Sequence, residues 1–250
     1  MHMASNPSLS VVIPAYNEAT NFKAGALDSV VKFLTKQKYT WEVLLVNDES
    51  TDQTKELLTT FCQQNPNFKL MTIAHGGKSA AVTAGVLSAL GEIILFSDFD
   101  QSTPIQEVAK FITAHQSGAD VAIGVRAQTT DDTWIRKIRS KAFLTLVQIV
   151  ALPGIQDSQC GFKSFSRLAA KKIFSSLKIS LGRKITGGYM GAFDVEVLFL
   201  ARKYGYKIEQ VPVAWKKILS EKLNVWKEPF QMATDTLKVR VYDILGKYEK

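Results

Sequence analysis

The strongest constraint on the fold is a regular alternation of short, branched apolar runs with amphipathic segments over residues 9–125. The apolar runs, each a predicted strand, are Ser10–Ile13, Val43–Val46, Lys69–Ile73, Ile93–Phe96 and Val121–Ile123. The amphipathic segments, each a predicted helix, cover residues 22–36, 51–63, 79–90 and 104–115. Strands that are apolar throughout and are joined by helices are typical of parallel sheets buried on both faces. The sequence therefore predicts the α/β class, with a Rossmann-like, mostly parallel central sheet flanked by helices.

This alternation stops after Arg126, where the basic stretch Arg136–Lys141 runs directly into the apolar stretch Ala142–Leu152. The apolar stretch has about half of the roughly 20 residues that a helix needs to cross a bilayer. A basic entry into a short apolar helix is typical of a segment that lies on a membrane surface, although a helix packed on the sheet would show the same pattern. Beyond this segment the pattern predicts a helix over 193–204, a strand over 208–213 and a helix over 230–245.

Charge is divided unevenly along the chain. The net charge is +8, with −4 on residues 1–125 and +12 on residues 126–250. A basic half indicates an anionic partner such as nucleic acid, an anionic membrane surface or a phosphorylated substrate. A basic surface that is merely solvated would give the same count, so charge alone leaves these alternatives open.

The length of 250 residues suits one large α/β domain with a full hydrophobic core as well as two small domains. We interpret residues 1–7 as a tag or disordered start and residues 8–250 as a single domain, with halves over 8–125 and 126–250. No charged-then-apolar leader precedes the first predicted strand, so we expect a cytoplasmic protein. Cys62 and Cys160 are far apart and lack a C-x-x-C spacing, which predicts two ordinary thiols.

Polar side chains follow the predicted strands where those strands end, which is the edge at which parallel sheets bind ligands. Asp98 and Asp100 come directly after one apolar run, and Gln101 follows them. Carboxylate oxygens are the ligands that Mg²⁺ or Mn²⁺ prefers, and such a cation would bridge Asp98 and Asp100 to a diphosphate. Gln101 could add a further oxygen. Aspartates at strand ends are also often only solvated, so this pattern is suggestive and not specific by itself.

Two further strand ends have candidate ligands for a nucleotide. Asp48 ends one strand and precedes a helix, so it either caps that helix or accepts a hydrogen bond from a nucleobase or ribose. Gly77 and Lys78 lie just before another predicted helix, where backbone amides and a cation could cradle a diphosphate. The glycine spacing differs from that of a P-loop, which argues against a kinase or NTPase.

Five motifs, taken in order, resemble those of the family 2 glycosyltransferases that make dolichyl-phosphate sugars. They are Pro14–Glu18, Val46–Asp52, Ser97–Asp100, Asp157–Lys163 and Ala192–Glu196. The resemblance covers residues 8–220, and within it Gln159–Lys163 is more similar to the glucosyltransferases than to the mannose synthases. It implies a GT-A fold and transfer with inversion at the anomeric carbon.

The resemblance also implies roles for individual residues. The nucleotide pocket would be lined by Pro14, Tyr16, Glu18 and Asp48. The metal would be held by Asp98, Asp100 and Gln101. The acceptor phosphate would be met by Arg126, Arg139 and Lys141, with Asp157 near the reaction centre. The sequence Asn47-Asp48-Glu49 departs from the two aspartates that many members have there, which leaves open which residue would act as a base.

We therefore expect a peripheral enzyme on the cytosolic face of a membrane, with an anionic membrane surface and no nucleic acid among its partners. The expected reaction is transfer of a hexose, most simply glucose from UDP-glucose, to a dolichyl or other polyprenyl phosphate, with Mg²⁺ or Mn²⁺. A mannose synthase that uses GDP-mannose and a transferase with a soluble glycan acceptor are the alternatives within the family. A nucleotidyltransferase would have a Gly- and Arg-rich loop after the first strand, and a nucleic-acid-binding module would leave the acidic strand ends without a role.

Overall fold

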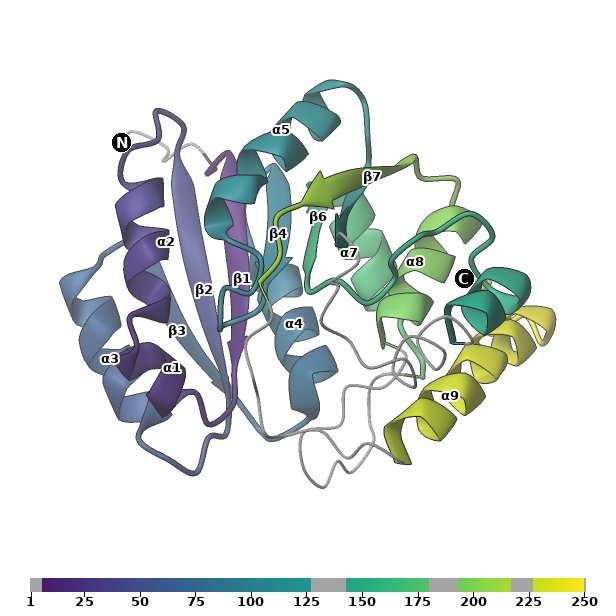
Figure 1. Ribbon diagram of the computed structural model, residues 1–250, viewed down its shortest axis with the longest axis horizontal. Coiled ribbons are helices and arrows are strands. Elements are labelled where there is room, and N and C mark those ends of the chain that lie inside the picture. Colours follow the sequence, from purple (N-terminus) through teal and green to yellow (C-terminus); the bar gives the residue numbers. More distant parts are fainter. Residues whose placement is uncertain (1–5, 127–142, 180–192, 217–226, 250) are drawn as a thin grey trace.

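The computed structural model describes residues 6–126, 143–179, 193–216 and 227–249, which form a seven-stranded sheet flanked by helices (Figure 1). The strands are β1 (Leu9–Ala15), β2 (Trp41–Asp48), β3 (Phe68–Ile73), β4 (Ile93–Ser97), β5 (Val121–Arg126), β6 (Phe162–Ser166) and β7 (Ile208–Val213). They are ordered β3-β2-β1-β4-β6-β5-β7, and every neighbouring pair runs parallel except the two that include β6. The prediction of a mostly parallel α/β sheet is confirmed.

Helices connect most of these strands, as the sequence pattern requires. They are α1 (Ala19–Lys23), α2 (Ala26–Leu34), α3 (Thr54–Gln64), α4 (Gly77–Ser88), the 3-10 helix η1 (Ile105–Glu107), α5 (Val108–Gln116), α7 (Arg167–Ser175), α8 (Phe193–Lys203) and α9 (Lys227–Ile244). Residues 143–150 are also helical. The predicted helix over 22–36 is divided, because Gly25 adopts a left-handed φ of 83° between α1 and α2.

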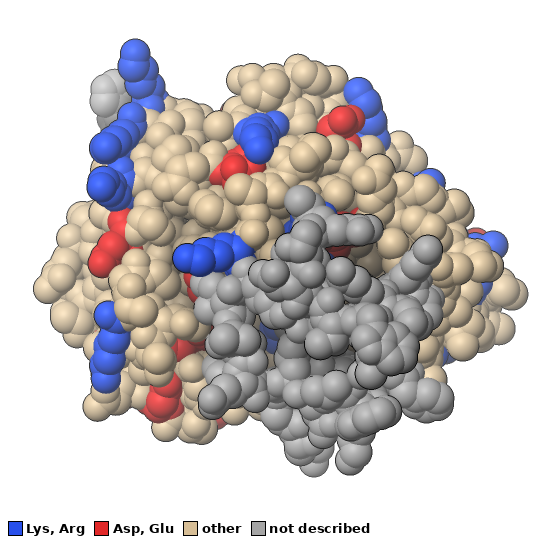
Figure 2. Space-filling model, viewed as in Figure 1, with Lys and Arg blue, Asp and Glu red and all other residues tan. Residues whose placement is uncertain are grey.

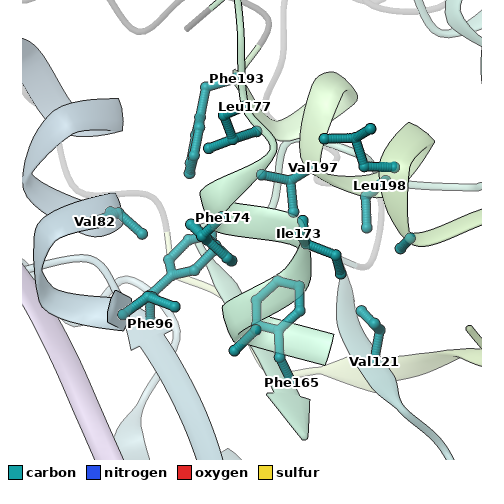
Figure 3. Close-up of a cluster of buried hydrophobic side chains, with 14 of the residues drawn as sticks. Val82, Phe96, Val121, Phe165, Ile173, Phe174, Leu177, Phe193, Val197 and Leu198 are labelled. Carbon is teal, nitrogen blue, oxygen red and sulfur yellow. The ribbon is translucent and has the colours of Figure 1, made fainter. Parts of the chain in front are cut away.

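Both faces of the sheet are buried, which explains why its strands read as continuous apolar runs. In β1, Val11 and Ile13 lie in a core with residues of α2, α3 and α5. Val12, between them, lies in a second core with residues of α4, α7 and α8. Figure 3 shows part of this second core, where aromatic rings from β4, β6, α7 and α8 pack together. Because helices cover both faces of the sheet, the strand ends are the part of it that is available for binding and catalysis.

The sequence pattern predicts every strand except β6, and it does not predict α7. β6 lies between β4 and β5 and pairs antiparallel with both. Its sequence includes Lys163, which is fully buried, and a lysine inside a central strand conceals the apolar pattern. The charge of Lys163 is balanced by Asp194, which lies 31 residues further along the chain. A partner so distant in sequence gives no local signal.

The segment predicted to be basic and then apolar lies only partly within the described residues. Within it, Val147 is fully buried in the second core, whereas Ile149 is 77% exposed. The helix over 143–150 therefore packs on the core with one face, as one of the two interpretations requires. Arg139 and Lys141 lie outside the described residues, and contact with a membrane stays a prediction. Within the described part of the chain, none of the helices is both long and apolar enough to cross a membrane.

The described basic side chains are dispersed on the face shown in Figure 2. Lys and Arg are spread singly across it, several of them along the edge where α2 lies. Among the described residues on this face they form no continuous patch, so the anionic partner inferred from net charge stays a prediction.

Candidate active site

Strained backbone marks the carboxyl edge of the sheet. Asn17, Glu49 and Gln101 have φ angles of 54°, 52° and 54°, in the left-handed region that residues other than glycine seldom adopt. They follow β1, β2 and β4, which are adjacent to one another in the sheet, with β1 in the centre. Such conformations persist only where surrounding contacts fix them, and they concentrate at functional sites.

Asp48 is tied to the loop that opens α4. Its carboxylate accepts hydrogen bonds from the backbone N–H groups of Gly76 and Gly77, both at 2.8 Å, and it is 1% exposed. His75 Nδ1 lies 3.0 Å from the same carboxylate. The amides of the predicted diphosphate cradle thus donate to Asp48, which acts as an internal anion at the helix N-terminus. The roles of Asp48 and Gly77 in nucleotide binding stay predictions.

The other predicted nucleotide residues lie next to this loop, at the end of β1. The Tyr16 ring stacks on the His75 ring, with centroids 4.6 Å apart. The backbone N–H of Glu18 donates to Thr54 Oγ1 at 2.7 Å, which joins the β1 loop to α3. Pro14 is next to last in β1. The aromatic pair thus stands beside Asp48, at an edge where a planar base could stack.

Lys78 and Asp98 form an ion pair between α4 and the end of β4. Lys78 Nζ lies 2.5 Å from Asp98 Oδ1, and the Asp98 side chain is 38% exposed. Burial by itself would lower the pKa of Lys78, but the carboxylates of Asp98, Asp194 and Asp100 outweigh burial and raise this pKa above its ordinary value. Lys78 is therefore a charged ammonium held on Asp98, one of the three predicted metal ligands.

Asp100 and Gln101 complete the predicted metal site. Asp100 accepts a hydrogen bond from the backbone N–H of Ser102 at 2.9 Å. The Gln101 amide nitrogen donates to the Asp98 carbonyl at 2.9 Å, while its Oε1 is buried with no hydrogen-bond partner among the described residues. Two carboxylates beside an unsatisfied amide oxygen fit a hard divalent cation, which takes its remaining ligands from water and substrate phosphates. In the described ranges no group of three or more His, Cys, Asp or Glu is arranged around such a cation.

Gly161, just before β6, packs directly against Asp98. Its carbonyl accepts from the Asp98 backbone N–H at 3.2 Å, and a Cβ atom added to Gly161 would overlap the Asp98 carboxylate. The position therefore requires a residue without a side chain, so that Asp98 can take its observed orientation.

We expect Gly161→Ala to raise the Mn²⁺ concentration needed for half-maximal transfer by about tenfold or more, because groups behind a metal ligand set its orientation. Activity measured across a Mn²⁺ titration gives this value. The control is Gly85→Ala, whose added Cβ would press on Val12 and Val46 in the core instead. Gly85→Ala should lower the melting temperature without changing the Mn²⁺ requirement. An unchanged requirement in Gly161→Ala would contradict the role of this contact.

Arg126 and Asp157 form a second pair at the end of β5. The guanidinium donates to both carboxylate oxygens, from Nε at 2.7 Å and from an Nη nitrogen at 2.9 Å. The Trp215 ring, just after β7, lies 5.4 Å from Arg126 Cζ. Burial opposes ionisation of both groups, but their mutual pairing lowers the pKa of Asp157 and raises that of Arg126, which Asp98 also helps to raise. Two predicted catalytic residues are thus brought together.

Sequence reasoning misses the individual roles of His75, Gly161 and Trp215. Gly161 lies inside one of the five motifs, and its lack of a side chain is the signal that could have found it. His75 and Trp215 act through stacking on residues distant in sequence, which no local pattern shows. Both cysteines are free thiols, as predicted.

Comparison with known proteins gives the class of protein to which this fold and this site belong. The sequence profile of Glycosyl transferase family 2 matches residues 10–174. The chain belongs to this family and is a glycosyltransferase. The predicted family and enzyme class are confirmed.

Similar curated proteins narrow the relationship within the family. The chain is 34% identical to a protein named dolichyl-phosphate beta-glucosyltransferase from Trichomonas vaginalis, over 96% of this chain and 75% of that protein. The Saccharomyces cerevisiae protein of that name is 34% identical over 96% of this chain and 76% of its own length. The Homo sapiens protein is 31% identical, over 96% and 77%. The resemblance to these glucosyltransferases is confirmed.

Solved structures have the same fold. Glucosyl-3-phosphoglycerate synthase from Mycobacterium tuberculosis, solved with Mn²⁺, UDP and glucosyl-3-phosphoglycerate, superposes with a TM-score of 0.67 at 16% identity, over 94% of this chain and 80% of that one. The mannosyltransferase PcManGT from Pyrobaculum calidifontis, solved with GDP-Man and Mn²⁺, has a TM-score of 0.57 at 17% identity, over 94% and 70%. The predicted GT-A fold is confirmed.

Proposed function

We propose that this protein transfers glucose from UDP-glucose to a dolichyl or related polyprenyl phosphate, with a divalent cation held at Asp98 and Asp100. The names of three relatives that match 96% of the chain support the sugar and the acceptor. The observation that carries the proposal is the contact between Lys78 and Asp98, in which Lys78 Nζ lies 2.5 Å from Asp98 Oδ1. Asp100 and Gln101 follow Asp98 at the same strand end.

Two anions have to meet in this reaction, the diphosphate of the donor and the phosphate of the acceptor. Cations on both sides would offset their repulsion and hold them in line. Lys78 belongs to the predicted diphosphate site and contacts Asp98 at the end of β4. Arg126 is the last residue of β5, which is separated from β4 by β6. In the protein without substrates, each of these two cations is paired with an aspartate. Lys78 pairs with Asp98, and Arg126 pairs with Asp157. Each could exchange that aspartate for a substrate phosphate.

On the donor side, Tyr16 and His75 would stack on the base, and Lys78 would donate to the diphosphate. A bound divalent cation would offset the negative charge that develops on the departing UDP. Asp98, Asp100 and Gln101 Oε1 are the groups that would hold it. These ligands are all oxygens, which suit Mg²⁺ and Mn²⁺ alike.

On the acceptor side, no general base is needed. A phosphate monoester has a second pKa of about 6, so it is mostly a dianion at neutral pH, and an anionic oxygen can attack the anomeric carbon without first losing a proton. Arg126 would orient that phosphate, with Arg139 and Lys141 as further proposed contacts. The bond from the anomeric carbon to UDP breaks as the new bond forms on the opposite face, which inverts the configuration. We also place the protein on the cytosolic face of a membrane, where a lipid acceptor and a soluble donor meet.

Transfer of labelled glucose from UDP-glucose to dolichyl phosphate in detergent, with MnCl₂, MgCl₂ or EDTA, tests this proposal. We expect a labelled lipid in the presence of a divalent cation and none in EDTA. Labelling from GDP-mannose in place of UDP-glucose would show a mannose synthase. Labelling of a soluble glycan without labelled lipid would contradict the proposed acceptor.

Lys78→Met is expected to weaken UDP-glucose binding by about tenfold or more, since a hydrogen bond to a charged group contributes roughly 1.5–3 kcal/mol. Displacement of a fluorescent UDP analogue, in Mn²⁺, measures the affinity. Lys55→Met, on the exposed side of α3, is the control and should bind as the wild type does. Equal binding by Lys78→Met and the wild type would remove Lys78 from the donor site.

A further inference from the structure

Behind the Asp98 loop lies a buried ion pair that the proposed reaction does not use. Lys163 of β6 and Asp194 of α8 have side chains that are 0% and 6% exposed, and Lys163 Nζ lies 2.6 Å from Asp194 Oδ1. The same ammonium lies 5.3 Å from the centre of the Phe96 ring in β4. Neither side chain is accessible enough to touch a substrate.

Stability alone is a poor explanation for this pair. Removing two charges from water costs several kcal/mol per ion, and exchanging a buried pair for apolar residues of similar volume is often neutral or stabilising. Lys163 lies beside Phe96 of β4, which belongs to the second core. The buried Lys163–Asp194 pair is better explained by the groups that its hydrogen bonds hold in place.

The hydrogen bonds of Lys163 lead to the metal site. Lys163 Nζ donates to the carbonyl of Cys160 at 2.5 Å, in addition to its bond with Asp194. That carbonyl belongs to the peptide that joins Cys160 to Gly161, and Gly161 is the residue against which the Asp98 carboxylate packs. The Asp98 backbone N–H is bonded to the Gly161 carbonyl as well. One buried ammonium therefore fixes the peptide that supports a predicted metal ligand.

Asp194 contributes a second link. It lies in the first turn of α8, where the positive end of the helix dipole favours a carboxylate. Its negative charge also reaches Lys78, whose Nζ lies 2.5 Å from Asp98 Oδ1. The buried pair is therefore connected to Asp98 through the Cys160–Gly161 peptide and through the charge of Lys78.

We propose that Lys163 and Asp194 are a positioning pair, which holds the Cys160–Gly161 peptide and thereby sets the Asp98 carboxylate for a divalent cation. This inference rests on the proposed metal site at Asp98 and Asp100. Both residues would act through Asp98, without contacting either substrate.

The test is the double variant Lys163→Met/Asp194→Asn, which removes both charges together and leaves neither unpaired. Free Mn²⁺, measured by its paramagnetic resonance signal in the presence of UDP, gives the binding affinity of the intact protein without any need for turnover. We expect the double variant to bind Mn²⁺ about 10–100-fold more weakly, the usual effect of losing a group behind a metal ligand. Circular dichroism should show an unchanged fold.

Asp194→Glu alone gives a second readout should the double variant fail to fold. It keeps both charges of the pair but lengthens the carboxylate side chain by one methylene, which displaces Lys163 and the Cys160 carbonyl to which it donates. Its Mn²⁺ affinity should therefore fall between that of the wild type and that of the double variant. The control is Glu42→Gln, which disturbs another buried polar network, with Ser10 and Lys69, at the amino ends of the strands. Glu42→Gln should lower the melting temperature and leave Mn²⁺ affinity unchanged.

The outcomes separate this inference from the function on which it rests. Wild-type protein that binds no Mn²⁺ with UDP would overturn the metal site, and the positioning role with it. Wild-type protein that binds Mn²⁺, together with folded single and double variants that bind it equally well, would overturn the positioning role alone. An equal loss of affinity in Glu42→Gln would show a general effect of stability and would also overturn it.

Discussion

Replacing Asp100 with alanine is expected to lower kcat/KM for glucosyl transfer by about 10³-fold or more. Charge stabilisation by a bound metal contributes several kcal/mol to the transition state, and each 1.4 kcal/mol corresponds to a factor of about ten in rate. Asp100 is the proposed ligand whose carboxylate has no ion pair among the described residues, so its loss removes a metal ligand while the Lys78–Asp98 pair remains. Steady-state kinetics in saturating Mn²⁺ measure the effect.

Asp28→Ala is the matched control, because Asp28 is exposed in the first turn of α2 and is not among the proposed site residues. It should retain full activity. The melting temperature of Asp100→Ala should stay close to that of the wild type, since within the described residues the substitution removes one hydrogen bond, which the Ser102 backbone N–H donates. Full activity in a folded Asp100→Ala protein would refute the metal site.

Replacing Arg126 with methionine is expected to lower kcat/KM for the acceptor by about 10²-fold, since removing one member of a hydrogen-bonded charged pair costs roughly 2–5 kcal/mol when the pair is buried and less for this partly buried pair. The KM of UDP-glucose should change little. In this variant Asp157 would remain as an unpaired carboxylate where the acceptor phosphate is proposed to bind. The substitution therefore removes a positive charge and leaves a negative charge that repels the phosphate. Varying each substrate at saturation of the other separates the two effects.

The double variant Arg126→Met/Asp157→Asn distinguishes a substrate contact from a structural ion pair. Removing both charges should restore the melting temperature towards that of the wild type, because no buried charge is left unpaired. Activity with the acceptor should stay low if Arg126 binds its phosphate. Recovery of both stability and activity in the double variant would show that the pair is structural only.

The fold was largely predictable because its signal is local and repeated. Strands buried on both faces, such as β1 and β2, have continuous apolar sequences, and the helices between them have one apolar side. β6 lacks this signal because Lys163 is compensated by Asp194, a partner that only the folded chain brings near. The break at Gly25 and the early start of α4 at Gly77 depend on local backbone geometry and were placed only approximately.

The position of the site was predictable for the same reason. Parallel strands bring Asp48, Asp98 and the end of β1 to one edge, so polar residues that follow apolar runs have to meet there. Which side chains pair could not be predicted, since pairing depends on distances across the sheet. Lys78 contacts Asp98, and Arg126 contacts Asp157, in each case joining residues that are far apart in the sequence. Arg139 and Lys141 lie outside the described residues, and their proposed contacts rest on resemblance.

Calorimetric titration of the wild-type protein with UDP-glucose, in Mn²⁺ and in EDTA, would examine the proposed donor and the proposed metal site together. GDP-mannose serves as the competing donor under the same conditions. We predict binding of UDP-glucose that requires Mn²⁺, with no comparable binding of GDP-mannose. Binding of GDP-mannose in place of UDP-glucose, binding that is unaffected by EDTA, or binding of neither donor would contradict the proposed function.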